Sequence, residues 1–149
     1  MSVDVQLIEH MMNPKNYGTL DDSNTQGMGK NPENGEKVAI YMRIANDEEE
    51  PYVDEIRFQA IGCTTTVVAG SMLTEEAKGL NLKGVSNLVE ATMGFLDKLP
   101  PEEAACSEMV AMALKAAINT YKERLIDPEY PMLTYKISNN CEPKEESNE

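Results

Sequence analysis

The sequence predicts an α+β domain in which a small antiparallel sheet of about three strands is covered on one face by helices. Two patterns indicate this class. Apolar and polar residues alternate over residues 38–44 and 55–60, which is typical of half-buried strands, and apolar residues recur three and four positions apart beyond residue 64, which is typical of helices. The length agrees, because 149 residues are enough for one domain with a substantial core.

The N-terminal third predicts a short helix followed by a long loop. Residues 4–12 carry apolar side chains on one side of a helix, and Asn13-Pro14 ends it. Residues 15–35 are rich in Gly, Asn, Asp and Lys, so we expect a loop with little core content.

Two strands and three helices follow in the expected order. The strands over residues 38–44 and 55–60 are joined by an acidic turn and should pair antiparallel. Helices are expected over residues 64–78, 85–95 and 100–125. The last of these begins at Pro100-Pro101, because proline is tolerated in the first helical turn.

The composition becomes irregular after Asp127-Pro128. We therefore predict one domain over residues 1–126 and a C-terminal extension over residues 127–149, which is expected to be partly disordered.

Charge and composition argue against several classes of protein. The chain has 26 acidic and 13 basic residues, for a net charge of −13, whereas binding to phosphates requires clustered Lys and Arg. No apolar run is long enough to span a bilayer, and residues 1–6 lack the features of a secretory signal. We expect a cytoplasmic protein with neither a nucleic-acid nor a membrane partner.

Two of the three cysteines lie close to predicted helix starts. Cys63 directly follows the second strand, and Cys106 follows Pro100-Pro101 by a few residues. Free N–H groups and the helix dipole favour the thiolate, which is the form that binds metal or attacks sulfur. The two residues therefore indicate metal or sulfur chemistry, although free cysteines are also often simply buried. Cys141, in the polar tail, is expected to be incidental; the alternative is that the tail folds back and Cys141 supplies a replacement thiol.

Five segments together carry a resemblance to a known family. They are Ile8-Glu9-His10 with residues 13–18, residues 31–36, residues 57–63, residues 99–107, and residues 115–122. In this order and spacing they resemble the U-type iron–sulfur scaffold family (IscU, SufU and the N-terminal domain of NifU). The resemblance extends from about residue 5 to residue 124.

This resemblance implies a function in iron–sulfur cluster assembly. Members of the family assemble iron and sulfide into a 2Fe–2S or 4Fe–4S cluster and pass it to acceptor proteins. Sulfur arrives as persulfide from a cysteine desulfurase. The family usually supplies three cysteines, an aspartate two residues after the first, and often a histidine beside the third.

The chain retains part of this set of ligands. By resemblance, Cys63 and Cys106 are ligands of a transient cluster, of iron or of zinc, and Glu36 occupies the aspartate position. Asn34 occupies the position of the first cysteine and Ala105 that of the histidine.

A further departure affects partner recognition. The lysine expected in the segment that a cluster-transfer chaperone recognises is Glu103, so the charge there is reversed.

Three interpretations of the function remain open. In the first, the chain is a scaffold or carrier that binds a cluster. Iron–sulfur clusters typically need four thiolates, and a two-fold dimer would reach four by pooling Cys63 and Cys106 from both subunits. Alternatively, the chain is a degenerate module that keeps the fold and regulates or bridges a partner without binding a cluster. An enzyme with a cysteine nucleophile is the weakest of the three, because His10 is the only histidine. We expect a non-enzymatic scaffold or carrier.

Overall fold

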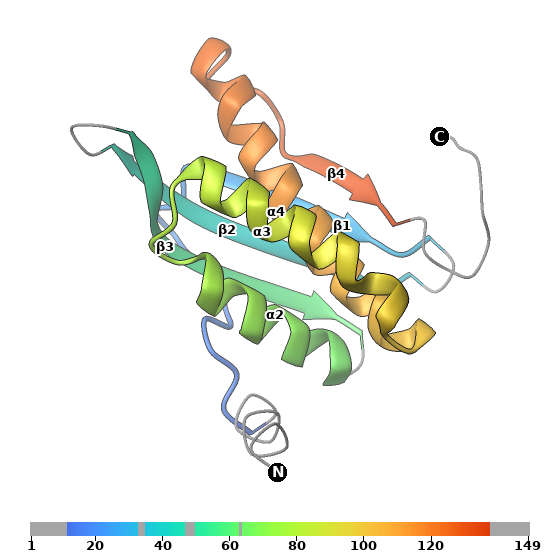
Figure 1. Ribbon diagram of the computed structural model, residues 1–149. Helices are drawn as coiled ribbons and strands as arrows, with labels where there is room; N and C mark the ends of the chain where they lie inside the picture. The colour runs from blue at the N-terminus through green and yellow to red at the C-terminus, as the bar shows by residue number, and fades with distance from the viewer. Residues whose placement is uncertain (1–11, 33–34, 47–49, 63, 138–149) are drawn as a thin grey trace.

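The computed structural model describes residues 12–32, 35–46, 50–62 and 64–137. The α+β class with helices on one face of the sheet is confirmed (Figure 1). The predicted helix over residues 4–12 lies outside the described residues except for Met12. In chain order the elements are β1 (Thr25–Lys30), β2 (Lys37–Asn46), β3 (Pro51–Ile61), α2 (Thr64–Ala77), α3 (Leu82–Phe95), the short 3₁₀ helix η1 (Leu96–Lys98), α4 (Pro101–Ile126) and β4 (Leu133–Lys136).

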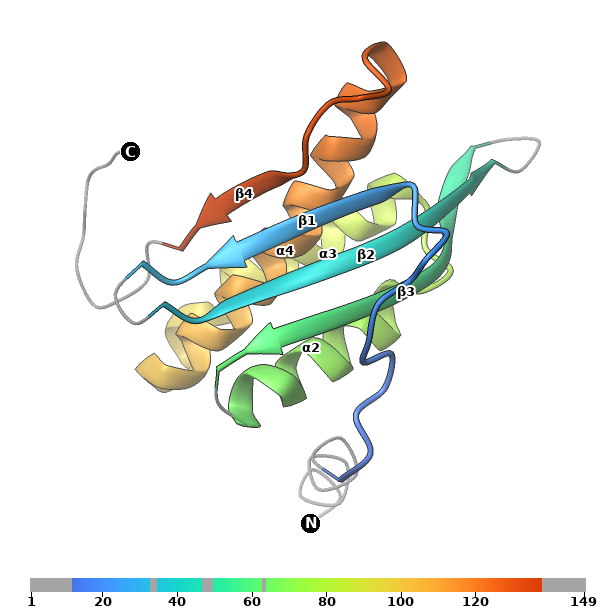
Figure 2. The same ribbon diagram turned by 180° about the vertical axis from the view of Figure 1, so that it is seen from behind.

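The sheet has four strands in the order β3-β2-β1-β4. The two predicted strands are confirmed as β2 and β3, which pair antiparallel, and β2 also pairs antiparallel with β1. β4 pairs parallel with β1, so the sheet is mixed and has one strand more than expected. The three predicted helices are confirmed as α2, α3 and α4, and Figure 2 shows the sheet from the face opposite to them.

The prediction of a loop over residues 15–35 was wrong for β1. Its inward-facing residues are Thr25, Gly27 and Gly29, so the strand lacks the apolar alternation that marks β2. Small residues are needed here because β1 lies directly against the backbone of α4. A Cβ atom at Gly29 would overlap the carbonyl oxygen of Met109, and one at Gly27 would overlap the backbone of Ala117.

β4 lies beyond residue 127, where the sequence predicted no strand. The backbone N–H of Leu133 donates to Thr120 Oγ1 at 3.0 Å, and Asn119 Nδ2 donates to the Tyr135 hydroxyl at 2.8 Å. Arg124 Nε donates to the carbonyl of Tyr130 at 2.8 Å. Side chains of α4 thus align this segment along β1. The division into residues 1–126 and 127–149 remains a prediction, and β4 means that the second segment contributes to the sheet.

The core lies between the sheet and the helices. The apolar side of β2 and β3 is fully or almost fully buried, and α4 and α2 pack on it. Gly70 of α2 faces the ring of Phe58, where a Cβ atom would overlap the ring. The buried strand residues are Val38, Ile40, Met42, Ile44, Val53, Ile56 and Phe58.

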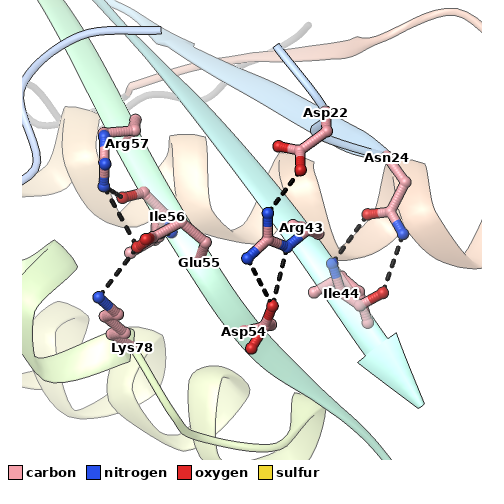
Figure 3. Close-up of polar contacts among 9 residues, drawn as sticks. All are labelled: Asp22, Asn24, Arg43, Ile44, Asp54, Glu55, Ile56, Arg57 and Lys78. Atoms are coloured by element: carbon pink, nitrogen blue, oxygen red, sulfur yellow. Dashed lines mark hydrogen bonds and ion pairs between the residues drawn. The ribbon is translucent and has the colours of Figure 1, made fainter. Parts of the chain in front are cut away.

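Polar side chains hold β2 to its neighbours away from this core (Figure 3). Arg43 forms ion pairs with Asp22 at 2.5 Å and with Asp54 at 2.7 Å. The hydrogen bond to Asp22 is the main reason that the pKa of Arg43 is raised. Asn24 accepts from the N–H of Ile44 and donates to its carbonyl, both at 2.9 Å, so its side chain continues the ladder between β1 and β2.

In the described part of the chain no helix is both long and apolar enough to cross a membrane.

Candidate functional site

The segments that carry the predicted site residues meet at one end of the sheet. Lys37 at the start of β2 pairs with Ile61 at the end of β3, and with Lys30 at the end of β1. α2 begins at Thr64 and α4 at Pro101, and Figure 1 shows both helix starts at this same end. The topology therefore brings together segments that are up to about 70 residues apart in sequence.

Cys106 lies in the second turn of α4 and points toward α2. Its side chain is only 2% exposed, and Thr66 Oγ1 donates a hydrogen bond to its Sγ atom at 3.1 Å. The helix dipole acts mainly within the first turn, so the expected influence of the α4 start on this sulfur is weaker than the sequence suggested. The hydroxyl of Thr66 is thus a polar group that the structure places within hydrogen-bond distance of the sulfur.

Glu36 lies beside the residue that precedes Cys63. A Cβ atom at Gly62 would lie 3.0 Å from the carboxyl carbon of Glu36, so the side chain passes directly over that glycine. The turn before β2 positions it: Asn31 N–H donates to the Glu36 carbonyl at 2.8 Å, and Gly35 has a φ of 78°, which favours glycine. Glu36 is half-buried. The carboxylate predicted as an oxygen ligand is therefore adjacent to the β3–α2 connection.

Four residues considered in the sequence lie outside the described residues: His10, Asn34, Cys63 and Cys141. The proximity of Cys63 to Cys106, which a shared ligand role requires, therefore stays a prediction. Among the described residues, no group of three or more His, Cys, Asp or Glu side chains is arranged to hold a metal ion.

The other two departures from the family pattern are within the described part of the chain. Ala105 is half-buried and has no polar side-chain atom, so the histidine position supplies no ligand. Glu103 is exposed, so the reversed charge lies on the surface at the start of α4.

An apolar groove of about 760 Å³ runs beside this site, between α2, α3 and the start of α4. Thr65 and Ser107, the sequence neighbours of Thr66 and Cys106, are among its lining residues. Two acidic residues also line it, Glu76 and Glu103. Neither the groove nor the position of Thr66 could be predicted from the sequence. The groove depends on how three helices pack, and the Thr64-Thr65-Thr66 run has no helical periodicity that distinguishes one threonine from the next.

Comparison with known proteins decides the family. A family model described as the NifU-like N terminal domain matches residues 3–127. The chain belongs to this family. The resemblance inferred from the five segments is thereby confirmed.

Members and structural neighbours of the family agree with this assignment. The chain is 31% identical over 117 residues to "Iron-sulfur cluster assembly scaffold protein IscU 1" of Archaeoglobus fulgidus, covering 78% of this chain and 74% of the relative. It is 28% identical over 127 residues to the scaffold protein IscU of Escherichia coli (strain K12), covering 83% and 97%. The crystal structure of a NifU-like N-terminal protein from Brucella abortus superimposes with a TM-score of 0.64 at 12% identity, covering 80% and 93% of the two chains, which supports the fold.

Proposed function

We propose that this chain is an iron–sulfur cluster assembly scaffold or a scaffold-like carrier, and not a catalyst. Membership of the NifU-like family, whose relatives above are named as cluster assembly scaffolds, carries the proposal. The geometry supports it, because Cys106 and Glu36, which the resemblance implies as ligands, lie on segments that meet at one end of the sheet.

The individual residues have distinct proposed roles. The Cys106 thiolate attacks the outer sulfur of a persulfide on the donor, the S–S bond of the donor breaks, and the donor leaves as a thiolate while Cys106 becomes the persulfide. Cys63 and Cys106 then hold iron or the cluster, which is the cargo of the protein. Glu36 serves as an optional oxygen ligand, which would make the cluster easier to release.

The partners follow from these roles. A cysteine desulfurase supplies sulfur, and cluster-acceptor proteins receive the product. One chain supplies two cysteines and one carboxylate, fewer than the four thiolates that clusters typically need. We therefore propose that a homodimer, pooling Cys63 and Cys106 from both subunits, forms when a cluster is bound. The proposed compartment is the cytoplasm.

A second function is favoured by two observations at the same site. Cys106 is almost completely buried, and Ala105 contributes no imidazole beside it. Both agree with a degenerate module that keeps the fold and binds or regulates a partner without a cluster. The Glu103 charge on the surface is also compatible with a change of partner.

Anaerobic reconstitution distinguishes the two functions. With iron, cysteine and an active desulfurase, the scaffold should develop visible absorption from sulfur-to-iron charge transfer and contain acid-labile sulfide. Cys106→Ala and Cys63→Ala should each abolish the absorption, because each removes a proposed soft ligand.

Cys141→Ala is the matched control and should leave the absorption unchanged. If the unmodified protein shows neither absorption nor labile sulfide while the desulfurase is demonstrably active, the degenerate module is the correct function.

A further inference from the structure

Among the α2 side chains whose burial the structure describes, three hydroxyls are buried: those of Thr66, Ser71 and Thr74. Two of them hold the segment that runs beside β3. Ser71 Oγ accepts from the N–H of Lys15 at 2.7 Å, and Thr74 Oγ1 accepts from Asn16 Nδ2 at 3.1 Å. These contacts give Ser71 and Thr74 structural roles. Thr66 differs, because its hydroxyl is directed at a sulfur atom.

The contact between Thr66 and Cys106 is shielded from water. Thr66 is 0% exposed and Cys106 is 2% exposed, with 3.1 Å between Oγ1 and Sγ. A neutral thiol is a weak hydrogen-bond acceptor, whereas an anionic sulfur is a much stronger one. A negative charge buried without a hydrogen bond is costly. The hydrogen bond from the Thr66 hydroxyl would therefore stabilise an anionic Cys106 sulfur more than a neutral thiol.

We propose that Thr66 is a positioning residue for Cys106. Its hydroxyl holds the sulfur in one orientation and stabilises the negative charge that the sulfur carries when it ligates iron or bears an added sulfur atom. Hydrogen bonds to ligand atoms raise metal affinity, and hydrogen bonds to cluster sulfurs tune the reduction potential. This inference rests on the proposed function of Cys106 as a ligand and adds a residue to it.

The stiffness of threonine suits this role. Branching at Cβ restricts χ1 within a helix, so the direction of the hydroxyl is limited to few orientations. Valine has nearly the same shape as threonine but no hydroxyl. Replacing Thr66 with valine therefore removes the hydrogen bond while leaving the packing between α2 and α4 almost unchanged.

A cobalt titration of the full chain tests the proposal. Co²⁺ bound to thiolates has a charge-transfer absorption band that reports both affinity and the electron density on sulfur. Thr66→Val should weaken Co²⁺ binding about tenfold or more and shift this band, because the sulfur loses the hydrogen bond from the Thr66 hydroxyl. Thr66→Ser should restore both values to near those of the unmodified protein.

Thr74→Val is the matched control. It also removes a buried hydroxyl from α2 but does not touch the sulfur, so it should lower the stability while leaving Co²⁺ affinity and the band unchanged. The proposal is overturned if folded Thr66→Val binds Co²⁺ as the unmodified protein does, if Thr66→Ser fails to restore binding, or if Thr74→Val weakens binding equally. Thr66→Ala replaces Thr66→Val if circular dichroism shows that the latter is unfolded.

A measurement without metal separates this proposal from the proposed function. In a Cys63→Ala/Cys141→Ala background, Cys106 supplies the only S–H stretching band in the Raman spectrum, and Thr66→Val should shift it. If the unmodified protein binds no Co²⁺ or iron, the ligand role of Cys106 fails. An unshifted S–H band would overturn the contact between Thr66 and the sulfur itself.

Discussion

The long helix α4 contacts β1 and α2 in different ways. Toward β1 the contact is made by backbone against backbone, and only glycine fits at residues 27 and 29. Toward α2 the contact includes a buried sulfur and a hydroxyl, Cys106 and Thr66. The contact with β1 depends on the close fit of two backbones, whereas the contact with α2 includes a hydrogen bond to a sulfur atom. We therefore expect stability and the proposed sulfur chemistry to depend on separate sides of one helix and to respond to different substitutions.

The β1 contact also contains one buried hydrogen bond, from Thr25 Oγ1 to the carbonyl of Ala117 at 2.6 Å. A single hydrogen bond of this kind contributes about 1 kcal/mol to stability. Forcing extra atoms into a close-packed contact costs about 1–3 kcal/mol or more. The largest effects on stability are therefore expected at the glycines.

Gly29→Ala should have the largest effect. The added Cβ would overlap the Met109 carbonyl, so β1 and α4 must separate, and we expect the free energy of unfolding to fall by about 3 kcal/mol. Urea denaturation followed by circular dichroism measures this. Co²⁺ affinity of the folded fraction should not change, and a parallel loss of affinity would show that the two sides of α4 are coupled.

Gly94→Ala is the control for that substitution. A Cβ at Gly94 meets nothing within 4 Å, and alanine is the better helix former in α3. This variant should be more stable by about 0.5–1 kcal/mol.

Asn34→Cys should change metal affinity and leave the stability of the metal-free protein unchanged. It restores a thiolate where the resemblance places the first cysteine, so affinity for Zn²⁺ or Co²⁺ should rise at least tenfold, which corresponds to about 1.4 kcal/mol. A competition titration with a chromophoric chelator gives the affinity, and the urea midpoint without metal should stay the same. Unchanged affinity would mean that residue 34 does not face the site.

Glu55→Gln should have the smallest effect on stability. Glu55 lies on β3 and takes no part in the two α4 contacts compared above. The hydrogen bond from Lys78 is the main reason that the pKa of Glu55 is lowered (Figure 3). A group with a lowered folded-state pKa stabilises the fold above its unfolded pKa of about 4.3 and loses that contribution as the pH falls through its folded pKa.

The difference in stability between Glu55→Gln and the unmodified protein should therefore be about 0.5 kcal/mol at pH 7 and should disappear toward pH 2. Thermal unfolding across this range measures it. Glu90→Gln, at an exposed position of α3, is the control and should change less at pH 7. A difference that persists at pH 2 would argue against the ion pair as its cause.

A strand or helix could be predicted from the sequence where its pattern lies in neighbouring residues, and was missed where it depends on packing against a distant segment. β2 and β3 were predicted because their buried residues, such as Ile40 and Phe58, alternate with polar ones. β1 was missed because its buried positions are occupied by Thr25, Gly27 and Gly29, which resemble a loop until α4 is packed against them. At the candidate site, Cys106 was proposed from its residue type, whereas nothing in the sequence separated Thr66 from its neighbouring threonines.

The sequence by itself determined the helices, two strands and the family, because periodicity and ordered motifs are properties of neighbouring residues. The tertiary structure alone decided which groups meet: Glu36 against Gly62, and the Thr66 hydroxyl on the Cys106 sulfur, 40 residues away in sequence. It also decided that β4 is a strand, since side chains of α4 hold that segment along β1. Such contacts depend on how elements pack, and packing is a property of the whole chain rather than of any local pattern.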